Sequence, residues 1–235
     1  MSAGKATGVL QRLEVPALVL VPATLLGCAY LQIDQAALLT MLVALLCLMV
    51  FFAGYERSRP PLKQIMPTVV LAALAAAGRM IFAPIPDFKP VSAIAIIAGV
   101  VFGKRCGFMV GALAALVSNF FFGQGPWTPW QMYAWGLMGY MAGVLASHGA
   151  FKRPAVLYAY GFLAPFLGYG LILNSWYVVG FVHPLTWPAV VAAFAAAAAL
   201  DLTHGVATVV FLLALYEPWK RKLQRIKNKY DLMLG

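Results

Sequence analysis

Charged side chains are scarce in this chain. Asp, Glu, Lys and Arg make up 10% of its 235 residues, whereas an ordinary soluble domain carries about 25%. Hydrophobic residues reach 63%, and the mean hydropathy is +0.86. No polar stretch is long enough to form a soluble domain with its own core, which excludes a membrane anchor joined to such a domain. The composition predicts an all-α, polytopic integral membrane protein.

Motifs for catalysis are also missing. The sequence contains no GxxxxGK[ST] phosphate loop, no HExxH, no GxSxG and no acidic pair suited to a metal. Its three cysteines show no CxxC or Cys/His spacing, so they are best interpreted as small buried hydrophobes. We therefore expect no enzyme, no cofactor and no metal site. Uphill transport would need energy from an ion gradient or from a partner.

Long apolar runs, by contrast, are abundant, and runs of roughly 20 residues predict membrane helices. Eight such segments lie near residues 15–31, 35–55, 64–83, 90–103, 106–122, 129–148, 154–180 and 187–216. The fourth, PVSAIAIIAGVVFG, is too short to cross a hydrocarbon core of about 30 Å upright at about 1.5 Å per residue. We expect it to be thinned at its ends or partly re-entrant.

The basic residues predict the topology of these spans. Two precede the first span, three follow the second, two follow the fourth, two follow the sixth and six follow the eighth, which places 15 of the 17 on one side. Because Lys and Arg collect in cytoplasmic loops, we predict a multi-pass protein of the cell membrane with both termini in the cytoplasm. The net charge of +10 is then explained by basic loops that lie beside anionic lipid headgroups, and binding to nucleic acid is not needed to explain it.

One uncharged stretch, SNFFFGQGPWTPWQM at residues 118–132, joins two of these spans on the predicted outer side. An aromatic belt at the membrane interface would explain Trp127 and Trp130. It would not explain the amides of Asn119, Gln124 and Gln131, because amides near hydrocarbon are costly unless they have partners. We expect these five side chains to line a ligand pocket.

Further polar residues fall on the same predicted side. Arg79 stands near the outer end of its span, where a guanidinium either faces a cavity or extends to the headgroups. Asp87 and Lys89 share a proline-rich loop and are placed to pair with each other. Asn174, Trp176 and His183 lie near the outer end of the seventh span. These clusters predict the mouth of a small-molecule site.

Asp201 and His204, deeper in the last span, lie three residues apart on one helix face. They are a proton relay or ligand contact on one interpretation; on the other they are a pair satisfied by a neighbouring helix, or Asp201 is an Asp near the midplane that stays protonated. The sequence favours neither interpretation.

Small residues recur at a spacing of four in two places. Ala72 with Ala76 and Ala73 with Ala77 form one row, and Gly107, Gly111 and Ala115 form another. Such rows allow close helix packing, either inside the protein or against another membrane subunit.

From about Leu62 onward the chain resembles the substrate-specific S components of energy-coupling factor (ECF) transporters. The resemblance is carried by LAALAAAGRMIFAPIPDFKPVSAIAIIAGVVFG, by GFMVGALAALVSNFFFGQGPWTPWQMYAWGLMGYMAGVL and by the tail KLQRIKNKYDLM. It implies a six-helix core over residues 62–219 that captures a vitamin or related micronutrient from outside, followed by a basic cytoplasmic tail at 220–235. The two helices within residues 1–61 depart from that pattern, and their role is open.

The resemblance also implies partners and a ligand class. The partners are a membrane-embedded T component and two cytoplasmic ATPases, with Ala72, Ala73, Ala76 and Ala77 on the docking face. The nearest branch suggests cobalamin, with His183 as a conceivable cobalt ligand, while queuosine precursors, riboflavin or another heterocycle would use the same rings and amides. The alternatives are a self-sufficient ion-coupled carrier that uses Arg79, Asp201 and His204, and a non-transporting membrane subunit.

Overall fold

Helices form every regular element of the described chain in the computed structural model, which describes residues 13–14, 16–17, 19–24, 27, 31, 36–57 and 62–230. They are α2 (Ala36–Arg57), α3 (Leu62–Ile81), α4 (Val91–Phe102), α5 (Lys104–Phe122), α6 (Thr128–Ser147), η1 (Ala150–Lys152), α7 (Pro154–Leu163), η2 (Ala164–Tyr169), α8 (Gly170–Phe181) and α9 (Trp187–Lys229). The all-α membrane fold is therefore confirmed.

The predicted spans from the second onward correspond closely to these helices. The seventh span is the continuous run α7–η2–α8, and the fourth is the short helix α4, of 12 residues. The first span, 15–31, lies largely outside the described residues. Three of the described helical segments are long and apolar enough to cross a membrane, namely Lys104–Phe122, Pro154–Phe181 and Trp187–Lys229.

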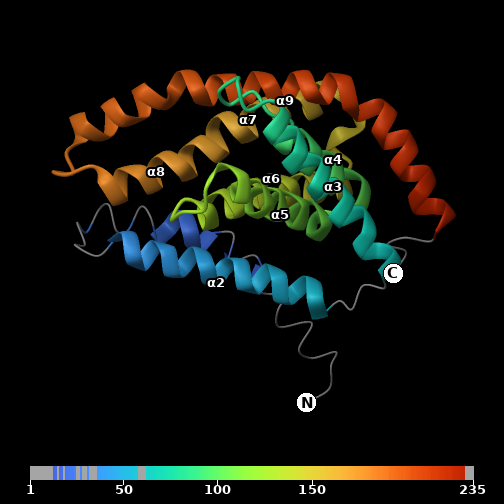
Figure 1. Ribbon diagram of the computed structural model, residues 1–235, viewed down its shortest axis with the longest axis horizontal. Helices are drawn as coiled ribbons and strands as arrows, with labels where there is room; N and C mark the ends of the chain where they lie inside the picture. The colour runs from blue at the N-terminus through green and yellow to red at the C-terminus, as the bar shows by residue number, and fades with distance from the viewer. Residues whose placement is uncertain are drawn as a thin grey trace, which may run out of the picture.

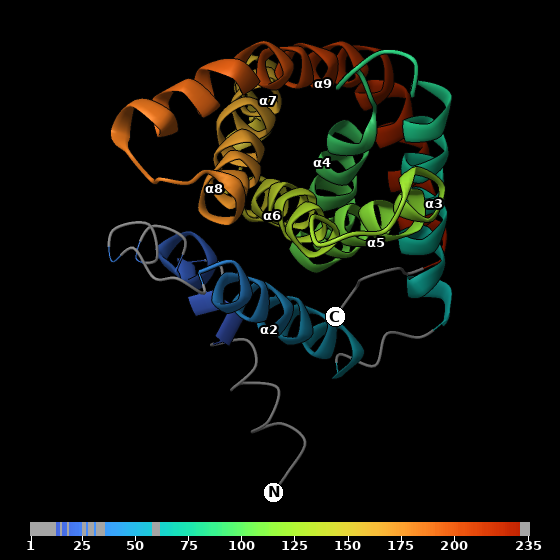
Figure 2. The same cartoon turned by 60° about the vertical axis from the view of Figure 1, so that its left-hand side comes forward.

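Helices α4, α5 and α6 form the centre of the core. Eleven of the 12 residues of α4 are buried, and Figure 2 shows this helix surrounded by α3, α5, α6, α7 and α9. Glycines allow the close packing, since a Cβ at Gly107 would collide with the backbone of Gly139, and one at Gly111 with the backbone of Trp135. The row Gly107–Gly111–Ala115 is thus an internal packing surface between α5 and α6.

Helix α9 is the longest element, with 43 residues, and it arches across one side of the bundle from α8 to α3 (Figure 1). It continues past residue 216, where the predicted span ends, through Pro218 to Lys229.

The described part of the N-terminal segment, residues 13–57 with their gaps, packs on the opposite side of the bundle, with α2 running beneath α5, α6 and α8 (Figures 1 and 2). The ring of Phe51 stacks on Phe108 at 3.9 Å and meets the edge of Tyr140 at 5.4 Å. The hydroxyl of Thr68 lies 3.2 Å from both the Tyr55 hydroxyl and the Cys106 sulfur. Aromatic and polar contacts therefore join this segment to the core.

Candidate functional site

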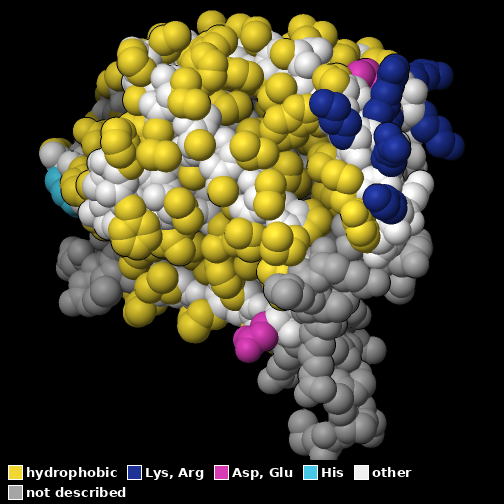
Figure 3. All heavy atoms as spheres, turned by 45° about the vertical axis from the view of Figure 1, so that its right-hand side comes forward, with side chains coloured by type: hydrophobic (Ala, Val, Ile, Leu, Met, Phe, Trp, Pro, Cys, Tyr) yellow, Lys and Arg dark blue, Asp and Glu magenta, His cyan; other side chains and the backbone are white. Residues whose placement is uncertain are grey.

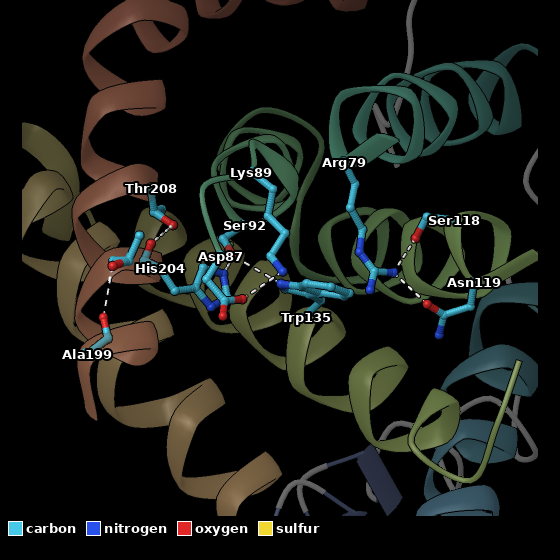
Figure 4. A network of polar contacts seen from close by, with 11 residues as sticks. Arg79, Asp87, Lys89, Ser92, Ser118, Asn119, Trp135, Ala199, His204 and Thr208 are labelled. Atoms are coloured by element: carbon cyan, nitrogen blue, oxygen red, sulfur yellow. Dashed lines mark hydrogen bonds and ion pairs between the residues drawn. The ribbon is translucent and has the colours of Figure 1, made fainter. Parts of the chain in front are cut away.

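Trp135 of α6 is the centre of a buried polar cluster (Figure 4). Its indole Nε1 donates a hydrogen bond to the Ser92 hydroxyl of α4 at 3.1 Å, and that hydroxyl lies 2.7 Å from Nε2 of His204 in α9. The ring of Tyr169 lies 5.0 Å from the Trp135 ring and 4.8 Å from the His204 ring. Side chains from α4, α6, η2 and α9 thus meet in one place.

Two cations point toward the Trp135 ring (Figure 4). The guanidinium carbon of Arg79 lies 5.0 Å from the ring centre and the Lys89 ammonium 6.0 Å, both within reach of a cation–π interaction. Arg79 is only 8% exposed and donates to Ser118 Oγ and Asn119 Oδ1, each at 2.6 Å. Because Arg79 turns into the core, the alternative in which it extends to the headgroups is wrong.

The loop between α3 and α4 brings Lys89 to this position. Phe82 and Phe88 pack against Phe211 of α9 at 5.1 and 5.2 Å and tie the loop to that helix. Asp87 adopts a left-handed backbone with φ 53°, which Asp tolerates better than most residues. Its carboxylate pairs with Lys89 at 2.7 Å, which confirms the predicted pair. Burial lowers the pKa of the Lys89 ammonium, and Asp87 acts in the opposite direction.

Asn119, fully buried on α5, connects Arg79 to the turn before α6. Its amide nitrogen donates to the Thr128 hydroxyl at 3.0 Å and to Gln131 Oε1 at 2.8 Å. Gln124 instead stabilises the turn itself, since it donates to the Leu116 carbonyl at 2.9 Å and accepts from the Thr128 hydroxyl at 3.0 Å. Of the three amides, Asn119 and Gln131 belong to the network around Arg79, and Gln124 lies exposed at its edge.

The two tryptophans of the turn have different environments. Trp127 is 37% exposed, and its ring covers Gly125, where a Cβ would collide with it. Trp130 is fully buried. Among the described residues, its indole Nε1 is a buried polar atom without a hydrogen-bond partner. Buried indole N–H groups usually have partners, so Trp130 is the more unusual of the two.

Of the remaining predicted residues, Asn174 and Asp201 contact each other. Asp201 accepts a hydrogen bond from Asn174 of α8 at 2.7 Å, while His204 bonds to Ser92, so each is satisfied by a different helix. Trp176 packs edge-on against Phe181 at 5.4 Å. His183 is exposed in the loop between α8 and α9.

The predicted docking alanines divide between two faces of α3. Ala72 and Ala76 are buried, at 3% and 1% exposure, on a helix that packs against α5. Ala73 is exposed and Ala77 is half-buried. Ala73 and Ala77 are therefore the pair that remains accessible to another subunit.

Sequence reasoning missed the central residues of the cluster, Trp135, Ser92 and Tyr169. A tryptophan and a serine inside apolar spans are ordinary packing residues by pattern alone. Tyr169 ends a π-helical segment, and such segments are frequent at functional sites, but no sequence pattern marks this one.

An all-helical membrane bundle with a buried guanidinium, amides and aromatic rings in one cluster is typical of membrane proteins that bind a solute. A comparison with protein families places the chain more closely. The model of the family described as "ECF-type riboflavin transporter, S component" matches residues 61–217, about two thirds of the chain. The chain therefore belongs to this family. No curated protein and no solved structure matches.

Proposed function

We propose that this chain is the substrate-binding S component of an ECF transporter and that it captures a vitamin from the outer side of the membrane. The observation that carries the proposal is the Trp135 cluster, in which the buried Arg79 guanidinium and the half-buried Lys89 ammonium lie against one ring, since ionisable groups at such positions in membrane proteins are costly and usually functional. Membership of the S-component family supports it further. A membrane-embedded T component and two ATPases would then supply the energy.

The chemistry around Trp135 favours a planar ligand with hydrogen-bond acceptors. The rings of Trp135 and Tyr169 are buried in this structure, at 0% and 8% exposure, so a planar ligand would stack on them by displacing the side chains that cover them. Among the described residues, Arg79 and Lys89 bring two positive charges near this ring, and Asp87 pairs with Lys89. Carbonyl oxygens on a heterocycle would complement that excess. Riboflavin, which the family description names, has this chemistry. The same description gives no support to the cobalamin branch, so cobalamin enters only as a comparison ligand.

The test is a titration of riboflavin fluorescence with the purified protein, in parallel with mass spectrometry of any ligand that copurifies. A flavin stacked on Trp135 should lose fluorescence. Arg79→Gln and Lys89→Gln each remove a charged donor, and each should cost about 1.5–3 kcal/mol, or roughly ten- to a hundredfold in affinity. Trp187→Phe and Arg153→Gln change exposed positions and are the matched controls.

Outcomes of this test separate the candidate functions. Tight binding of cobalamin without riboflavin would move the substrate to the cobalamin branch. Unchanged affinity in Arg79→Gln and Lys89→Gln, measured on folded protein, would contradict the assignment of the site to Trp135. Solute uptake by the chain alone in vesicles would instead favour the ion-coupled carrier, with Arg79, Asp201 and His204 as coupling residues.

A further inference from the structure

An apolar groove of about 490 Å³ lies at the opposite end of α3 from Arg79. Its lining consists of five side chains of α3 between Met66 and Leu74, Phe102 at the end of α4, four side chains of α9 between Trp219 and Ile226, and Tyr230 directly after α9. Lys222 is the charged member of that lining. The charge distribution predicts that this end faces the cytoplasm, so the groove is distinct from the ligand site.

The end of α9 is held in place as one wall of this groove. The Lys227 ammonium donates to the backbone carbonyl of Val101 at 2.8 Å, in the last turn of α4. Carbonyls at a helix C-terminus lack partners within the helix and attract cations. This contact fixes the last turns of α9 relative to α4, so the groove is a built feature of the fold.

Positive charge borders the groove in excess of the negative charge beside it, where Glu217 pairs with Arg221 at 3.9 Å. The sequence from Pro218 to Tyr230 contains six Lys or Arg residues and no Asp or Glu. Lys222, Arg225 and Lys229 recur at the spacing of one helix face, and Lys222 reaches the groove lining itself. Figure 3 shows Lys and Arg side chains gathered at one edge of a largely hydrophobic surface.

We propose that this groove binds an anionic phospholipid, with an acyl chain along the apolar lining and the phosphate headgroup at Lys222, Arg225 and Lys229. Basic pockets between membrane helices on the cytoplasmic side recognise such headgroups. Trp219 in the lining is a residue type that favours the headgroup level. A lipid carries an apolar chain for the groove and, next to it, a negative charge for the basic residues. A protein segment would need both an apolar stretch and an acidic residue at the same spacing.

Brominated lipids test the proposal through Trp219, because bromine on an acyl chain quenches a nearby indole. The full chain is reconstituted in phosphatidylcholine vesicles that contain a small fraction of brominated phosphatidylglycerol or of brominated phosphatidylcholine. The Trp219 signal is the difference from the Trp219→Phe variant. We expect phosphatidylglycerol to quench it at a much lower fraction than phosphatidylcholine does.

Variants assign that preference to the groove. Replacement of one of the basic residues that bind the headgroup should weaken the preference for phosphatidylglycerol about fivefold. The double variant Lys222→Gln with Arg225→Gln should weaken it about twentyfold. Lys152→Gln with Arg153→Gln removes the same charge at exposed positions before α7 and should leave it unchanged. Val70→Phe fills the lining and should reduce quenching by both lipids.

Three results would overturn the proposal. The first is equal quenching by the two lipids, and the second is a preference that survives the Lys222/Arg225 double variant. The third is relief of quenching by a purified T component equally in both lipids, which would assign the groove to a protein contact. None of these measurements uses the vitamin, so failure here leaves the proposed function standing.

Discussion

Replacement of Glu14 by Gln should loosen the attachment of the N-terminal segment to the core. The Glu14 carboxyl is 1% exposed, and its Oε1 lies 2.8 Å and 2.9 Å from two guanidinium nitrogens of Arg105. Its Oε2 lies 3.4 Å from the Lys104 ammonium and accepts a hydrogen bond from the Tyr140 hydroxyl at 3.0 Å. Lys104 and Arg105 begin α5, where the helix dipole disfavours cations, so the carboxylate offsets both charges.

The geometry sets the size of the effect. Removal of one partner from a fully buried ion pair costs about 3–5 kcal/mol, because the other charge is left buried. Here Arg105 and Lys104 are 25% and 44% exposed, so both can regain water. Gln also keeps the shape of Glu14 and an oxygen for Tyr140. We therefore expect a loss of about 2 kcal/mol in the free energy of unfolding, below the fully buried range.

Equilibrium unfolding in mixed micelles of mild and denaturing detergent measures this loss. Glu56→Gln is the matched control, since Glu56 is an exposed carboxylate of α2. In a double-mutant cycle, Arg105→Gln should add little once Glu14 is already Gln, because the two residues share one interaction. If Glu14→Gln destabilises the protein no more than Glu56→Gln does, the ion cluster does not hold the N-terminal segment, and the reasoning fails.

Four further predictions concern topology, energy, docking and the site. A reporter fused after Gly235 should appear on the cytoplasmic face, and its appearance outside would refute the charge argument. The isolated chain should bind ligand without ATP turnover, because the sequence has no phosphate loop; turnover free of contaminating ATPase would refute this. Ala73→Leu should impair uptake by the assembled transporter and spare ligand binding, whereas Ala196→Leu, also exposed, should affect neither. Asn119→Ala should weaken ligand binding by about 1–3 kcal/mol and Gln124→Ala by less, as calorimetry would show, because Asn119 alone of the two bonds to Arg79.

The helices were largely predictable because the bilayer imposes a length and an apolar composition on each span. Even the short α4 was recognisable, because the apolar run that forms it is itself short in the sequence. The end of α9 was not. Hydropathy falls where the basic residues begin, but Lys, Arg and Gln are good helix formers, so the helix continues from the predicted end at residue 216 to Lys229.

The candidate site was predictable only where burial is costly. Arg79 and Asn119 stood out because a guanidinium or an amide inside an apolar span needs a partner, and the two are partners of each other at 2.6 Å. Trp135 gave no such signal, since an indole in a span usually packs without a specific role. The position of Lys89 depends on Phe82 and Phe88 contacting Phe211, a contact between distant segments that no local pattern contains.

Charge balance distinguishes the two ends of the core. At Glu14 a buried carboxylate faces two cations that are partly open to water, so the protein neutralises its own charge there. At Trp135 the Arg79 guanidinium is buried and the Lys89 side chain is 17% exposed, and among the described residues the carboxylate of Asp87 is bonded to Lys89. Arg79 is left with neutral acceptors and aromatic rings. Because a buried cation in a membrane protein is costly to maintain, we expect a ligand to supply further acceptors beside Arg79.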